Sequence, residues 1–297
     1  MEQVKTVCDR FVEKAEELSI DLEKMKAISG LIARQEVPGR RLGEMCFGVE
    51  YLWQELGFLE KEDQKKLLEK YWKFISELKF FLSPKMLEKD LDQYTDLMHD
   101  MVLSLIRQED GFYKKPDINE LFELALQTIR QMKEIVRIYY PDGVKEIILL
   151  PDTNCLFLAP AIENWEFNEI KEYTLLFSPT VLSEIDSKKV SGNERVKASA
   201  KTLSRQFKEY NRRGNTLEGI RLKPGVTLKM RALEPKFEEM FSALDSTNND
   251  DRIIMTCFGV MRENPQAEVY LVTADINMQN KARFWEIALL EAPEKEE

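Results

Sequence analysis

Acidic residues follow, or lie close to, short apolar segments in the second half of the chain. They are Asp152, Glu184, Asp251 and Asp275. If the segments form one parallel sheet, we expect these four acids at one edge, because the polar sites of such sheets lie beyond the carboxyl ends of the strands. Carboxylates gathered without basic partners repel one another, and a hard divalent cation that prefers oxygen ligands removes this conflict. The pattern therefore predicts a Mg²⁺ or Mn²⁺ site, with Asp152 closest to the ion.

Composition excludes several other kinds of site. The chain has one histidine, His99, so a site with several histidine ligands is impossible, and we expect His99 to be a partly exposed helix residue. The four cysteines are too few and too scattered for a disulfide framework or a Cys-x-x-Cys zinc site, which is typical of a chain in a reducing cytoplasm. A single acid after a strand is commonly only a helix cap. Four acids at corresponding positions favour chemistry performed by carboxylates.

The elements that must position these acids alternate between strand and helix. Apolar segments that predict strands are 146–150, 175–179, 226–233, 269–272 and 287–290. Helical patterns lie between them at 180–188, 193–213, 250–262 and 277–285. This alternation predicts an α/β domain with a mostly parallel sheet flanked by helices.

Four motifs around the acids resemble those of the PIN domain family of metal-dependent ribonucleases. They read Asp-Thr-Asn at 152–154, Val-Leu-Ser-Glu-Ile-Asp at 181–186, Asn-Asp-Asp-Arg-Ile-Ile at 249–254, and Leu-Val-Thr-Ala-Asp-Ile-Asn-Met-Gln-Asn-Lys-Ala at 271–282. The last motif is similar to the PIN subgroup of RNA-processing and PhoH-linked proteins. The resemblance covers about residues 145–290.

The resemblance implies a PIN-like fold, one or two Mg²⁺ or Mn²⁺ ions, and hydrolysis of RNA phosphodiester bonds. The family's acids fall on Asp152, Glu184, Asp251 and Asp275, which are then both catalytic residues and metal ligands. Its supporting polar positions fall on Asn154, Thr273 and Asn277. Asp250 and Asp251 compete for one position, and the family's Asp-x-x-Ile spacing favours Asp251, with Asp250 as a supporting residue.

A basic strip lies within an acidic chain. The net charge is −10, yet residues 187–231 hold thirteen Lys or Arg and only three Glu. The strip is either a solvated helix face or a surface that binds the phosphates of an RNA backbone. In the second interpretation the substrate-binding residues are Lys188, Lys189, Arg195, Lys197, Arg212 and Arg213. With few aromatic residues among them, the strip favours contact with the backbone of single-stranded RNA over recognition of its bases.

The first half of the chain has a different pattern. Residues 1–140 carry apolar side chains at helical spacing and no catalytic motif, which predicts an all-α accessory domain that restricts or recruits substrate. A dimerisation element or a docking site for a regulatory protein is the alternative role. Turn residues at 140–143 predict the boundary, with the PIN-like nuclease domain at 145–297.

Two other functions remain open for the second half. A catalytically silent PIN-like module would bind RNA or protein, and loss of an acid is its usual sign, but no acid is missing here. A DNA nuclease of the flap type would carry more acids and dedicated junction-binding elements. The chain lacks the 18–20 consecutive apolar residues that a membrane helix needs, so we expect no membrane partner and a cytoplasmic location.

Overall fold

The computed structural model describes residues 5–34, 50–83, 99–108, 117–140, 146–167, 170–236 and 243–293. The chain divides into two compact units. One consists of Cys8–Pro141, and the other combines Met1–Val7 with Asp142–Glu297. A fragment that starts near residue 142 therefore lacks a short piece of its own unit.

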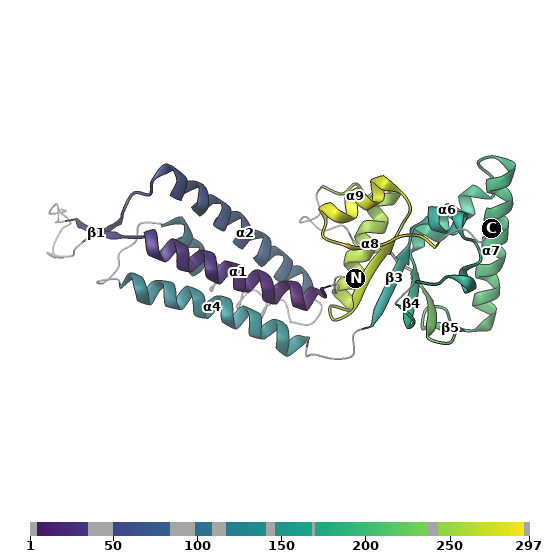
Figure 1. Ribbon diagram of the computed structural model, residues 1–297, viewed down its shortest axis with the longest axis horizontal. Helices are drawn as coiled ribbons and strands as arrows, with labels where there is room; N and C mark the ends of the chain where they lie inside the picture. The colour runs from purple at the N-terminus through teal and green to yellow at the C-terminus, as the bar shows by residue number, and fades with distance from the viewer. Residues whose placement is uncertain are drawn as a thin grey trace, which may run out of the picture. The chain divides into compact units, whose positions relative to one another are not determined.

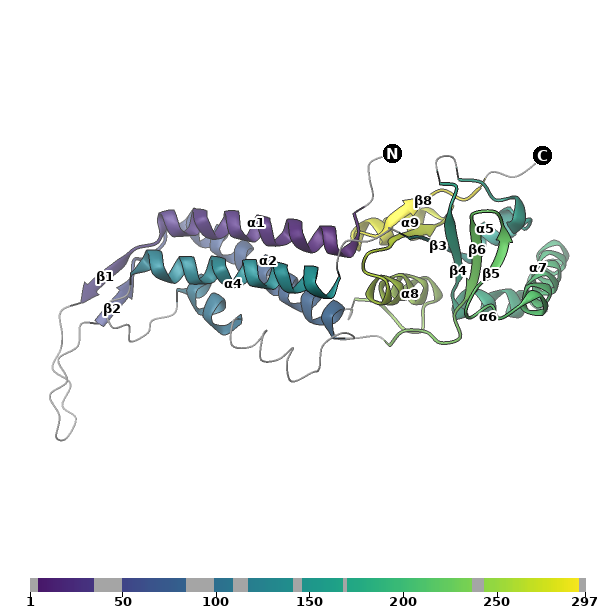
Figure 2. The same cartoon turned by 90° about the horizontal axis from the view of Figure 1, so that it is seen from below.

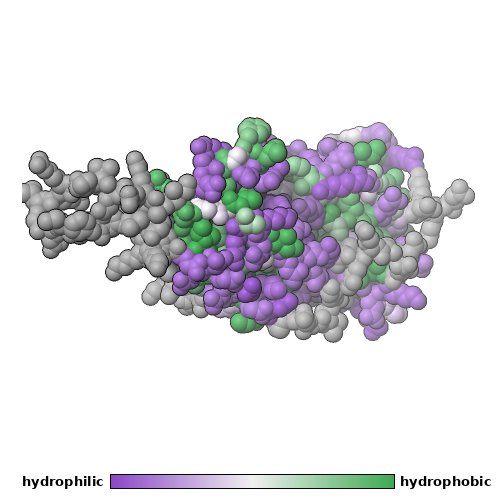
Figure 3. All heavy atoms as spheres, turned by 60° about the vertical axis from the view of Figure 1, so that its left-hand side comes forward, coloured by the Kyte–Doolittle hydropathy of each residue, from purple (hydrophilic) through white to green (hydrophobic). Residues whose placement is uncertain are grey.

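The first unit is built around three long helices that lie side by side, α1 (Val7–Ile28), α2 (Phe58–Leu82) and α4 (Ile118–Tyr139) (Figure 1). Residues 99–108 include a further helical segment. The helices bury their apolar faces against one another, and Phe11 of α1 meets the rings of Phe74 and Phe81 of α2 edge to face at 5.9 and 5.7 Å. Hydrophilic side chains cover most of the described surface in view in Figure 3, with hydrophobic ones in scattered groups.

Several expectations for this unit can be compared with the structure. The sequence Pro116-Asp117 predicts the start of a helix, and α4 begins there, because the Asp117 side chain accepts a hydrogen bond from the backbone N–H of Asn119 at 2.8 Å. Ser83-Pro84 also predicts a helix start, but that helix would fall largely on residues 84–98, outside the described part. Strands β1 (Leu31–Arg34) and β2 (Glu50–Trp53) pair antiparallel, which the helical pattern did not predict.

The expectation of a partly exposed His99 is wrong. This residue is 7% exposed, stacks on Tyr71 with ring centroids 5.5 Å apart, and meets the edge of Trp72 at 4.6 Å. Helical spacing shows which residues share a face, but the depth of burial depends on the neighbouring helix. The one histidine of the chain is therefore a core residue of the helical unit.

The second unit is an α/β fold. Within the described residues, six strands form one sheet in the order β5-β6-β4-β3-β7-β8. All neighbouring strands are parallel except β5 and β6. The strands are β3 (Ile147–Pro151), β4 (Tyr173–Phe177), β5 (Ile220–Lys223), β6 (Val226–Met230), β7 (Glu268–Val272) and β8 (Ala288–Leu290).

Helices cover both faces of this sheet, as the sequence predicts. Figure 2 shows α5, α6 and α7 on one face and α8 and α9 on the other. Their bounds are α5 (Thr153–Leu158), α6 (Pro179–Lys188), α7 (Glu194–Arg213), α8 (Asn249–Glu263) and α9 (Ile276–Phe284), with a short 3₁₀ turn, η1, at Ile162–Asn164. β4 is buried along its whole length, because it lies inside the sheet between two helical layers.

Two elements of the unit were not predicted. Strand β5 pairs antiparallel with β6 through a tight turn at Gly225, whose φ of +76° favours glycine and whose Cα lies too near the Lys171 carbonyl oxygen for a side chain. Helix α5 spans six residues, too few for an apolar period to be visible in the sequence. This short helix turns the chain directly after β3 and therefore positions Asp152 and Asn154.

Candidate metal centre

Asp152 lies where β3 ends and α5 begins. Its backbone N–H donates to the carbonyl of Val272 at 3.0 Å, so the pairing of β3 with β7 fixes its place. Its Oδ1 accepts from the backbone N–H of Cys155 at 2.8 Å, and its Oδ2 accepts from the Thr273 hydroxyl at 2.6 Å. The Asp152 side chain thus caps α5, and its carboxylate has a fixed orientation. The residue is 3% exposed. Each oxygen keeps a second lone pair for a further partner.

Asp275 stands beside it at the end of β7. Its Oδ1 caps α9 by accepting from the backbone N–H groups of Asn277 and Met278, at 2.7 and 3.2 Å. Its Oδ2 accepts from Asn154 Nδ2 at 3.4 Å. The buried Thr273 hydroxyl donates to Asp152 and accepts from the Asp275 backbone N–H at 3.0 Å, so one side chain fixes both acids. Asn277 contacts Asp275 through its backbone.

Glu184 extends from α6 and is held at both carboxylate oxygens. Oε2 accepts from the Thr153 hydroxyl, and Oε1 accepts from Asn249 Nδ2 at 2.6 Å. These donors come from α5 and from the first turn of α8, which bind Glu184 from two directions. The sequence analysis gave no role to Thr153 or Asn249, because polar residues are common near the start of a helix.

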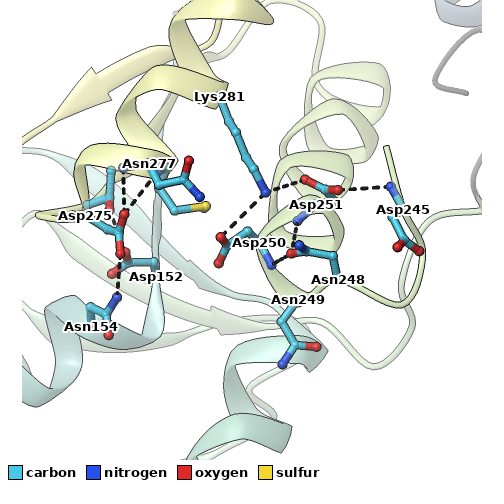
Figure 4. Close-up of polar contacts among 12 residues, drawn as sticks. Asp152, Asn154, Asp245, Asn248, Asn249, Asp250, Asp251, Asp275, Asn277 and Lys281 are labelled. Carbon is cyan, nitrogen blue, oxygen red and sulfur yellow. Dashed lines mark hydrogen bonds and ion pairs between the residues drawn. The ribbon is translucent and has the colours of Figure 1, made fainter. Parts of the chain in front are cut away.

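The two aspartates at the start of α8 point in different directions (Figure 4). Asp251 Oδ2 accepts from the backbone N–H of Asp245 at 3.0 Å, and its Oδ1 lies 2.7 Å from Lys281 Nζ. Asp250 Oδ2 lies 3.6 Å from the same ammonium group. Asp251 is therefore held by two donors on the side of α8 that faces residue 245.

Asp250 instead lies in the electrostatic field of the other acids. Burial raises the pKa of its carboxyl group, Lys281 opposes this, and the charges of Asp275 and Glu184 raise the pKa further. Mutual repulsion of this kind is what a cation removes. The structure thus brings Asp152, Asn154, Thr273 and Asp275 together, and directs Asp250 rather than Asp251 towards Asp275 and Glu184.

The donor set has the chemistry of a hard-cation site. It is made of carboxylate and amide oxygens, which Mg²⁺ and Mn²⁺ prefer. Among the described residues, no three acidic, histidine or cysteine side chains lie close enough to enclose a metal ion by themselves. This arrangement fits Mg²⁺, which usually keeps several waters and takes one or two carboxylates from the protein.

The residues predicted to bind substrate lie in two groups, one around the end of α6 and the start of α7, and one in the last turn of α7. Lys188 and Arg195 are exposed, while Lys189 pairs with Asp186 at 2.5 Å and Lys197 with Glu194 at 3.0 Å. At the other end of α7, Arg212 pairs with Glu209 at 3.4 Å, and Arg213 with Glu163 of η1 at 2.9 Å.

The contacts around Arg213 connect the last turn of α7 with two parts of the unit. Its partner Glu163 lies two residues before Trp165, whose carbonyl accepts from the Tyr173 hydroxyl and from Lys223. On the other side, Asn211 accepts from the Thr216 hydroxyl, and the Thr216 carbonyl accepts from the backbone N–H of Met230, the last residue of β6. The substrate role of this turn stays a prediction.

Comparison with known families identifies this unit. A family model of the PIN domain matches residues 149–291. These residues form a PIN domain. The resemblance proposed for residues 145–290 is thereby confirmed, and a search of curated proteins finds no match to the chain. No described helix is both long enough and apolar enough to cross a membrane.

Sequence reasoning did not assign a role to Lys281, although it lies in the motif that carries the resemblance. The signal in the sequence was its place in that motif, six residues after Asp275. What the sequence lacks is the crossing of α9 over α8, which brings the lysine of the PIN domain to Asp250 and Asp251.

Proposed function

We propose that the PIN domain of this chain is a metal-dependent endoribonuclease that hydrolyses RNA phosphodiester bonds with Mg²⁺ or Mn²⁺. The observation that carries the proposal is the pair of carboxylates, Asp152 and Asp275, that the buried Thr273 hydroxyl orients side by side at the carboxyl ends of β3 and β7. Beside them, burial and the charges of Asp275 and Glu184 raise the pKa of Asp250. A divalent cation compensates repulsion of this kind.

Two aspartates, Asp152 and Asp275, would hold the ion, with the charge of Asp250 acting on the same site. Bound there, a divalent cation supplies charge neutralisation for the scissile phosphate and activation of the attacking water. Glu184, oriented at both oxygens, would accept a hydrogen bond from that water and direct it at the phosphorus. No histidine is needed as a base, which suits a chain whose one histidine is buried in the helical unit.

The choice of Asp250 departs from the family spacing that favoured Asp251. The partner that distinguishes Asp251 is a cation, because Lys281 Nζ lies 2.7 Å from its Oδ1 and 3.6 Å from Asp250 Oδ2. The other Asp251 oxygen accepts from the Asp245 backbone N–H. We therefore assign Asp251 to holding α8 against α9, and Asp250 to the acidic site.

Single-stranded RNA is the proposed substrate, with its backbone bound by cations near the end of α6. Lys188 and Arg195 are exposed there, and Lys189 and Lys197 lie within the same stretch. The helical unit is proposed as an accessory element that restricts or recruits substrate, or that joins a second copy or a regulatory protein.

The test compares the purified full chain with its Asp152→Asn variant on single-stranded RNA and on DNA of the same sequence, with Mn²⁺ and with a chelator. We expect RNA cleavage by the wild type in Mn²⁺ alone. Asn keeps the shape of Asp and can cap α5, so the variant should fold and fail to cleave. Equal cleavage by the two proteins would refute the role of Asp152.

A catalytically silent module that binds RNA or protein is the second candidate. It makes the opposite prediction, namely binding of RNA without cleavage in any divalent cation. The nuclease is favoured because no acid of the set is missing and because the charges of Asp275 and Glu184 raise the pKa of Asp250, as is expected where a cation binds.

A further inference from the structure

A chain of polar contacts leads away from Glu184 to residues that the proposed chemistry does not use. Its first link is Asn249, half-buried in the first turn of α8, whose Nδ2 donates to Glu184 Oε1 at 2.6 Å. An asparagine amide has a donor end and an acceptor end of nearly equal size. Only one of its two orientations donates to Glu184, and the other would turn an oxygen towards the carboxylate.

Arg252 determines which orientation Asn249 adopts. Its Nη1 donates to Asn249 Oδ1 at 3.4 Å. A guanidinium group has donors and no acceptor, so the oxygen of the amide must face it and the nitrogen must face Glu184. Arg252 lies about one helical turn after Asn249 and thus determines which end of the Asn249 amide faces Glu184.

Glu234 holds the arginine in place. Its Oε2 accepts from Arg252 Nε at 2.7 Å and lies 2.6 Å from Arg252 Nη2, and its Oε1 accepts from the Thr180 hydroxyl. Thr180 is fully buried at the start of α6, the helix that carries Glu184. Glu234 also pairs with the positive charge of Arg252.

We propose that Glu234 is a positioning residue of the PIN domain. Through Arg252 and Asn249 it orients the Glu184 carboxylate. The proposal rests on the proposed function, since Glu184 matters only if the acids bind a cation. It concerns three residues, Glu234, Arg252 and Asn249, to which neither the motifs nor the family match gives a role.

The test measures Mn²⁺ affinity from the electron paramagnetic resonance signal of free Mn²⁺, beside kcat and KM for single-stranded RNA. Loss of a residue that orients a ligand typically weakens metal binding or activity by about 10- to 100-fold. For Glu234→Leu we expect the Mn²⁺ dissociation constant to rise about tenfold and kcat to fall, with KM nearly unchanged. Glu263→Leu is the matched control, because Glu263 binds Arg231 at 2.7 and 2.8 Å at the opposite end of α8.

Two further variants separate positioning from a general structural effect. Glu234→Gln can still accept from Arg252 and donate to the Thr180 hydroxyl, so it should recover most of the lost Mn²⁺ affinity. Glu234→Leu should add almost nothing in an Asn249→Ala background, because residues that act through one another are not additive. If Glu234→Leu fails to fold, Arg252→Lys breaks the same chain at its middle link and should raise the dissociation constant as well.

The outcomes are distinct. Wild-type affinity in a folded Glu234→Leu or Arg252→Lys variant would overturn the positioning role, as would full additivity with Asn249→Ala. A wild-type protein that neither binds Mn²⁺ nor cleaves RNA would instead refute the proposed function. Wild-type binding and cleavage together with a selective loss in Glu234→Leu support both.

Discussion

Replacing the two adjacent aspartates of α8 one at a time should give opposite results. Asp250→Asn removes a carboxylate whose pKa is raised by burial and by two neighbouring charges, so its ionised form is unfavourable in the folded protein without metal. The melting temperature of the metal-free protein should stay the same or rise. Cleavage of single-stranded RNA should fall by about 100-fold or more, the usual cost of removing a group that stabilises charge in the reaction.

Asp251→Asn should lose stability instead. It removes a charge-assisted hydrogen bond between Lys281 and a carboxylate that is 11% exposed. Such a bond contributes about 1.5–3 kcal/mol, and Lys281 is 24% exposed and retains Asp250 as a partner, so we expect a loss of about 2 kcal/mol. In a domain of this size that corresponds to a decrease of about 4–8 °C in melting temperature.

The assay pairs thermal denaturation followed by circular dichroism with RNA cleavage at 25 °C, where both variants should be folded. Asp251→Asn should retain cleavage within about tenfold of the wild type, because its carboxylate faces away from the other acids. The reverse pattern would refute the assignment. If Asp251→Asn is stable and inactive while Asp250→Asn cleaves normally, the family spacing identified the ligand and the hydrogen-bond geometry did not.

Three other predictions follow from single contacts. Lys188→Gln should reduce the slope of log Kd against log salt for single-stranded RNA by about 0.7, the value for one phosphate contact, whereas Arg213→Gln should leave it unchanged, because Arg213 already pairs with Glu163 at 2.9 Å. Mn²⁺ at about 100 times its dissociation constant should stabilise the wild type by about 2.7 kcal/mol and raise its melting temperature, and Asp152→Asn should show a much smaller rise. In the helical unit, burial tends to raise the pKa of Asp21, but hydrogen bonds from Lys24 and Lys70 outweigh it and lower the pKa. The resulting stability is present above the unfolded pKa of about 3.9 and is lost as pH falls through the lower folded value, so in urea unfolding the advantage of the wild type over Asp21→Asn should be present at pH 7 and vanish near pH 2.

The sequence by itself determined the class of the second unit and where its acids stand along the strands. Apolar segments of strand length alternate with amphipathic helices, and parallel strands have one common carboxyl edge, so Asp152 and Asp275 could be placed together before any coordinates. Their neighbours Asn154 and Thr273 followed from the resemblance to the PIN family, whose supporting polar positions they occupy. Strand β5 and helix α5 were not predicted, because they are too short to show a periodic pattern of apolar residues.

Only the tertiary structure decided which side chains act on the acids from other elements. Successive residues of a helix point about 100° apart, so the sequence cannot tell which of Asp250 and Asp251 faces the site. The answer depends on Lys281 of α9 and on the backbone of residue 245, which occupy the oxygens of Asp251. The same holds for Glu234 and Arg252, whose contact joins residues eighteen positions apart, and for Arg213, which contacts Glu163 fifty positions earlier in the chain. Such contacts depend on how the helices cross the sheet, because side-chain spacing along one element carries no information about the element packed against it.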